Sequence, residues 1–108
     1  MRKVTLRDEK DGLDSRYLWA YLDDAGILHI EGQDLGPSTS IVSTDGEYEW
    51  HEAINARDLP LLLNLLGAPP DANILDILER HWSGSKAGDL EKLLRESGIQ
   101  VKRSVWSG

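Results

Sequence analysis

The chain has 108 residues, of which 40% are hydrophobic and 29% charged, and this composition predicts one folded domain, residues 1–108, rather than a disordered chain. A formal net charge of −7 would repel a phosphate backbone, and no apolar stretch approaches the ~20 residues that span a bilayer, so we expect neither nucleic acid nor a membrane as a partner. The absence of cysteine excludes disulfides and thiolate chemistry and fits a cytoplasmic protein, which is the localisation that we expect.

The N-terminal half has the alternating pattern of β-strands. Residues 2–7 alternate polar side chains with Val4 and Leu6, and the charged segment 8–12 predicts a loop. Residues 17–22 and 27–31 predict a hairpin around the turn 23–26. The glycines and the proline of 32–38 predict that the chain leaves the sheet, and 40–44 predicts a short strand. Asp45 and Gly46 predict the turn of a second hairpin, which the strand 47–54 completes.

The C-terminal half changes to the leucine spacing of helices. We expect a helix over 58–66, a second one that Asp71 caps and that ends near Trp82, a third over 86–96, and a final strand over 99–106. Strands followed by helices predict an α+β fold, in which an antiparallel sheet of four to six strands carries three helices packed on one face. The helices need an aliphatic floor, for which we assign Leu18, Ala20, Leu22, Leu28 and Ile30.

The segment 17–22 is apolar on both of its sides. Once its aliphatic residues face the helices, Tyr17, Trp19 and Tyr21 must face the other way. Two alternatives follow for these rings. Either they form an exposed surface that a partner covers, or the final strand, Trp106 or the loop 33–46 folds over them as a second small core.

The same sheet face collects histidines and carboxylates. The period of a strand places Glu47, Glu49 and His51 on one side, with His29 and Glu31 aligned on a neighbouring strand. Such groups bind zinc or act as acid and base in some proteins, but they are also the ordinary solvated face of an antiparallel sheet. We therefore predict no catalytic residue, no metal site and no cofactor. The candidate interaction face consists of Tyr17, Trp19, Tyr21, His29, Glu31, Glu47, Glu49 and His51.

Four segments resemble those of a family of small bacterial α+β proteins of unknown function. They are Glu31-Gly32-Gln33-Asp34-Leu35-Gly36, Tyr48-Glu49-Trp50, Trp82-Ser83-Gly84 and Arg95-Glu96-Ser97-Gly98-Ile99. The resemblance covers most of the chain after residue 17. It implies a bacterial origin and a shared fold, and it transfers no functional residue.

These features predict a non-catalytic protein-interaction module of the kind represented by small acidic inhibitor and immunity proteins. Its expected partner is a protein with a basic surface or a second copy of the chain. The alternative is a small ligand-binding protein or a metal-dependent enzyme that uses the histidine and glutamate face.

Overall fold

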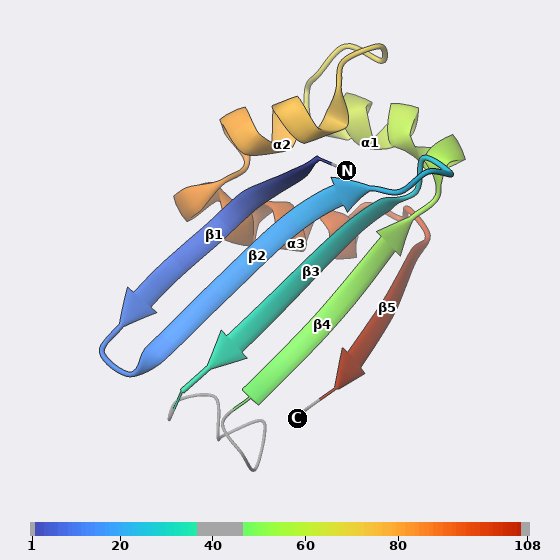
Figure 1. The fold of residues 1–108 in the computed structure, drawn as a ribbon. Coiled ribbons are helices and arrows are strands. Elements are labelled where there is room, and N and C mark those ends of the chain that lie inside the picture. Colours follow the sequence, from blue (N-terminus) through green and yellow to red (C-terminus); the bar gives the residue numbers. More distant parts are fainter. Residues whose placement is uncertain (1, 37–46, 107–108) are drawn as a thin grey trace.

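The computed structural model describes residues 2–36 and 47–106 and confirms the predicted α+β fold (Figure 1). Five antiparallel strands form one sheet in the order β1-β2-β3-β4-β5. The strands are β1 (Lys3–Asp11), β2 (Asp14–Leu22), β3 (Leu28–Leu35), β4 (Glu47–Ile54) and β5 (Val101–Trp106). The helices are α1 (Leu59–Leu65), α2 (Ile74–His81) and α3 (Ala87–Glu96), with short 3-10 turns η2 (Ala56–Asp58) and η3 (Gly84–Lys86) before α1 and α3. Among the described residues, no helix has the length and apolar character needed to cross a membrane.

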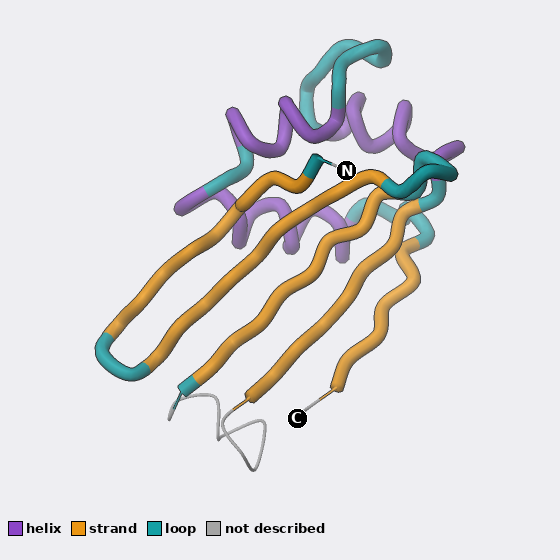
Figure 2. Tube along the Cα trace, viewed as in Figure 1, coloured by secondary structure: helices purple, strands orange, loops and turns teal. Residues whose placement is uncertain are grey.

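The hydrophobic core lies between the helices and one face of the sheet. The predicted floor is confirmed, because Leu18, Ala20 and Leu28 are fully buried, Ile30 is 1% exposed and Leu22 packs against the same cluster. The helices bury Leu62, Leu78 and Leu90 against it. Figure 1 shows all three helices on this side, and in Figure 2 the tip of the β1–β2 hairpin extends away from them.

The predicted hairpin of β2 and β3 is confirmed, with Leu22 opposite Leu28. Its turn is stabilised by Asp23, whose Oδ1 accepts hydrogen bonds from the backbone N–H groups of Ala25 and Ile27 at 2.9 and 3.0 Å. Gly26 supplies the left-handed conformation of the turn, with φ of 80°. The turn therefore places the Asp23 carboxylate at one end of both strands.

The predicted loop over 8–12 is wrong for residues 8–11, because β1 continues to Asp11 and pairs there with β2, whereas Gly12 lies in the turn that follows. Charged residues are tolerated on β1 because it is an edge strand, whose side chains reach water. The register shifts between Thr5 and Arg7, with Leu6 as the extra residue, and both Leu6 and Val4 are buried. This bulge turns Arg7 toward the helix side, where its guanidinium lies 3.9 Å from Glu91.

The prediction that the chain leaves the sheet at Gly32 is also wrong, because β3 continues to Leu35. Gly32 lies opposite Trp50, whose indole ring covers it so closely that a Cβ atom would lie 2.1 Å from the ring. The glycine is therefore needed for close packing and does not end the strand. The predicted strand 40–44 and the turn at Asp45 and Gly46 lie outside the described residues.

The start of α2 and the start of the final strand differ from the prediction. Asn73, not Asp71, caps α2, since its Oδ1 accepts hydrogen bonds from the N–H groups of Leu75 and Asp76 at 3.0 and 3.2 Å. The final strand begins at Val101, and Ile99 before it is 8% exposed and belongs to the core.

Candidate functional site

The sheet has a second face, opposite the helices, which we call the open face. Cross-strand register places Trp19 opposite Glu31 and Glu31 opposite His51, while Tyr21 lies opposite His29. Tyr17 and Glu49 both lie opposite Gln33, and Glu47 occupies the register position opposite Leu35. The register thus aligns on this one face all of the positions predicted from the sequence.

No described helix or strand lies over the open face. The three helices pack on the other side, and β5 pairs with the edge of β4 instead of folding across the rings. The alternative in which the final strand covers these rings is therefore wrong. The alternatives that involve residues 37–46 or the side chain of Trp106 lie outside what the structure describes. Tyr17, Trp19 and Tyr21 are each partly buried and partly exposed.

Trp19 is held in place from two directions. Its indole Nε1 donates a hydrogen bond to Glu31 Oε1 at 3.0 Å, and the ammonium group of Lys3 lies 4.5 Å from the centre of its ring. An ammonium group at this distance over an aromatic ring is a cation–π contact. The ring is therefore fixed in one orientation and already interacts with a cation.

Tyr21 is fixed by its neighbour on β3. Its ring stacks on the imidazole of His29, with centres 4.8 Å apart and planes 10° from parallel. Burial raises the pKa of the Tyr21 phenol above its usual range, and the Glu31 carboxylate adds to this rise through its charge and a hydrogen bond. Tyr21 is therefore a neutral side chain with a hydrogen-bonding hydroxyl at neutral pH.

A row of three hydrogen-bonded side chains crosses the open face. Asp23 Oδ2 lies 2.7 Å from His29 Nε2, and His29 Nδ1 lies 2.8 Å from His51 Nε2. The hydrogen bond from His29 lowers the pKa of Asp23, and the N–H of Ile27 contributes to the same direction. Because the carboxylate accepts, His29 Nε2 carries a proton. When His29 is neutral, its Nδ1 accepts a hydrogen bond from the Nε2–H of His51, so the tautomer of one ring fixes that of the other.

This row of hydrogen-bonded side chains has a geometry through which a proton can move. Among residues 2–36 and 47–106, no group of three or more histidine, aspartate or glutamate side chains has the arrangement of a metal site. An aspartate that orients an imidazole is the arrangement of a general base. The hydrogen-bonded row of Asp23, His29 and His51 is therefore suited either to an ordered recognition surface or to proton-transfer chemistry.

The helix side of the sheet hides charges that the sequence analysis did not identify. Glu52 is 5% exposed, lies opposite Arg103 of β5 and shares a small cavity with Arg103, Glu91 and Arg95. Burial raises the pKa of the Glu52 carboxyl, the charge of Glu91 adds to the rise, and the charges of Arg103 and Arg95 oppose it. Glu52 is too deeply buried to meet a partner.

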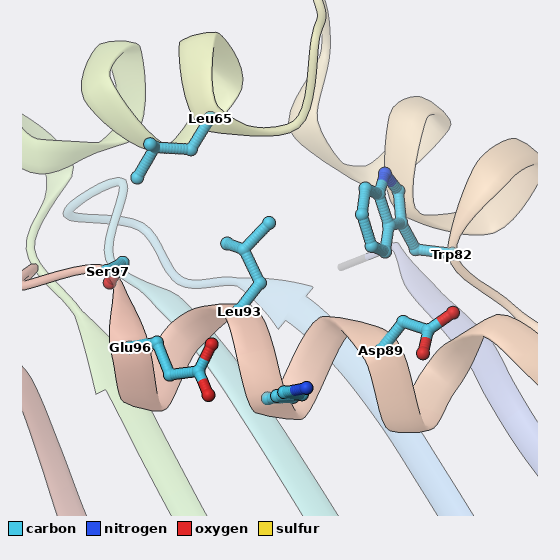
Figure 3. A pocket seen from close by; sticks show the side chains of 7 residues that line it. Leu65, Trp82, Asp89, Leu93, Glu96 and Ser97 are labelled. Carbon is cyan, nitrogen blue, oxygen red and sulfur yellow. The ribbon is translucent and has the colours of Figure 1, made fainter.

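A shallow groove also crosses the helix layer (Figure 3). Leu65 of α1 and Leu93 of α3 lie along it, with Trp82 just after α2 at its end. Asp89 and Glu96 border it on α3 together with Lys92, so the charges at its edge have mixed sign.

Comparison with known proteins adds no relative. No protein-family model, curated protein or solved structure matches this chain. The site is therefore interpreted from its geometry alone.

Two neighbours of the candidate site were not identified from the sequence. Asp23 was assigned only to the turn and Lys3 only to the first strand, although they contact His29 and Trp19 of the open face. The turn offered one signal, because a short hairpin loop brings its first residue close to the start of the returning strand.

Proposed function

We propose that this protein is a non-catalytic interaction module that acts in the cytoplasm and binds a protein partner through its open face. The observation that carries the proposal is the row of partly exposed aromatic rings on that face, with Trp19 hydrogen-bonded to Glu31 and Tyr21 stacked on His29. Aromatic side chains that are already ordered lose little entropy on binding and are enriched where interfaces gain most of their affinity.

The partner that fits this face presents lysine or arginine side chains. Trp19 already has the ammonium of Lys3 above its ring, and Glu31 and Glu49 lie on the same face. The net charge of −7 also favours association with a basic surface. A basic protein would therefore exchange its own cation for Lys3 and place further cations beside the carboxylates.

Affinity capture with two matched variants tests this proposal. The unmodified chain, Trp19→Ala and Leu61→Ala are immobilised, and the proteins that each recovers from native cells are quantified by mass spectrometry. Leu61 is a suitable control because it is 51% exposed and lies on α1, away from the open face. We expect a basic protein that the unmodified chain and Leu61→Ala recover equally and that Trp19→Ala recovers at least about tenfold less. Equal recovery by all three chains would contradict the proposal.

A second candidate function is supported by the chain from Asp23 through His29 to His51. In this alternative, His51 acts as a base on a bound small molecule, and Asp23 orients His29 behind it. This alternative also includes a metal-dependent enzyme, and titration with zinc chloride in a calorimeter tests whether these histidines bind a metal ion. We expect no saturable heat at one ion per chain, whereas stoichiometric binding that His51→Ala abolishes would favour the enzyme.

A further inference from the structure

A cavity of about 270 Å³ lies at one end of β4 and β5, at the border of the open face. Ala53 lines it and is the direct cross-strand neighbour of both His29 and Lys102. The rest of the wall comes from the turn before β3, from the segment around η2 and from the residues at the start of β5: Ile27, Asn55, Arg57, Asp58, Gln100 and Lys102. Three separate parts of the chain thus converge on one cavity.

Two cations, Arg57 and Lys102, line the cavity. Within the described residues, neither Arg57 nor Lys102 forms an ion pair, whereas Arg2, Arg7 and Lys86 each lie within 4 Å of a carboxylate. Two cations that converge on one cavity wall form a local site for an anion.

We propose that this cavity binds a small ligand that carries one carboxylate group. Arg57 and Lys102 hold the carboxylate, and the side-chain amides of Asn55 and Gln100 supply hydrogen bonds at its edges. The apolar part of the ligand contacts Ile27 and Ala53. This site takes an anion, whereas the proposed protein partner is basic, so the inference does not depend on the proposed function.

The wall also decides against a phosphate. Asp58 lines the same cavity, and its carboxylate repels a doubly charged anion more strongly than a singly charged one. The volume of about 270 Å³ lies just under the range that holds drug-sized molecules, so the ligand is a small organic acid.

An NMR titration of the full chain tests the site with 3-methylbutanoate, which joins one carboxylate to a branched apolar group. We expect saturable shifts of the amide signals of Ala53, Asn55, Arg57 and Lys102, with a dissociation constant in the range of about 1–10 mM for so small a molecule. The neutral 3-methylbutanamide has nearly the same shape. Because it lacks the charge, we expect it to bind at least about tenfold more weakly.

Three variants complete the test. All three replaced side chains are exposed, so their loss should leave the amide spectrum of the folded protein otherwise unchanged. Arg57→Gln and Lys102→Gln should each weaken 3-methylbutanoate binding about tenfold, while Arg80→Gln on α2 should leave it as it is. Shifts that do not saturate, equal binding of the amide, or unchanged binding by Arg57→Gln would each overturn the proposal. Inorganic phosphate that binds more tightly than the carboxylate would overturn the assigned ligand class.

Discussion

Replacing Trp19 with alanine distinguishes a surface ring from a core ring. The variant loses the hydrogen bond to Glu31, worth about 1 kcal/mol, and the contact with Lys3, worth about 0.5–1 kcal/mol at an exposed site. The loss of buried apolar area adds little to this cost, because the ring is only partly buried. We therefore expect the free energy of unfolding to fall by about 2 kcal/mol, which leaves a domain of ordinary stability folded.

Trp50 provides the matched comparison on the other face of the same sheet. It is 5% exposed, it covers Gly32, and its ring centre lies 5.6 Å from that of Tyr48. Removing so buried a ring costs about 3–5 kcal/mol. Urea unfolding followed by far-ultraviolet circular dichroism measures both losses, since tryptophan fluorescence would change with either substitution. If Trp19→Ala lost as much stability as Trp50→Ala, Trp19 would be a core residue and the account of the open face would be refuted.

Three further predictions test the packing, the buried charge and the helix cap. Gly32→Ala should destabilise the fold by about 1–3 kcal/mol through the clash with the ring above it, while Gly88→Ala, inside α3, should be neutral or stabilising; equal effects in thermal unfolding would refute the close contact. Burial raises the pKa of Glu52, so the folded state retains a proton that the unfolded state loses as the pH rises above about 4, and this group's contribution to stability falls as the pH rises through its folded pKa. Glu52→Gln should accordingly be more stable than the unmodified chain at pH 8 and lose this advantage at pH 4, and an unchanged pH profile of the melting temperature would contradict the argument. Asn73→Ala should cost about 1 kcal/mol in urea unfolding and Asp71→Ala less than about 0.5 kcal/mol, whereas the reverse order would restore the cap predicted from the sequence.

The composition of both sheet faces could be predicted because a strand has a period of two. Once Leu18 and Ala20 were assigned to the helices, Trp19 had no other face to occupy, and the register then aligned Glu31 and His51 beside it. The aromatic and histidine positions of the candidate site therefore follow from the sequence pattern alone.

Features that depend on partners distant in the sequence could not be predicted in this way. Gly32 has the sequence appearance of a strand end, and only its pairing with Trp50 explains why a glycine remains inside the sheet. Glu52 shares a face with Trp50 and is buried, although a glutamate is normally solvated. Arg103, brought alongside by β5, offsets part of that cost.

The hydrogen bonds of the open face could not be predicted from the sequence either. The alternation of β3 and β4 placed His29 and His51 on one side, but the 2.8 Å contact between them depends on side-chain rotamers and on the turn that positions Asp23. The sequence thus predicted which residues share the open face, but it did not predict the hydrogen bonds between them.

The central claim, that the open face receives a protein partner, is tested most directly by cross-linking from that face. Tyr17 is replaced by a photoreactive benzoylphenylalanine, which preserves an aromatic side chain on β2, and the control carries the same group at Leu61 of α1. Both chains are irradiated in cells that make the protein naturally. We predict one discrete adduct with a basic protein from position 17 and none from position 61. The same adducts from both positions, or none from position 17, would contradict the claim.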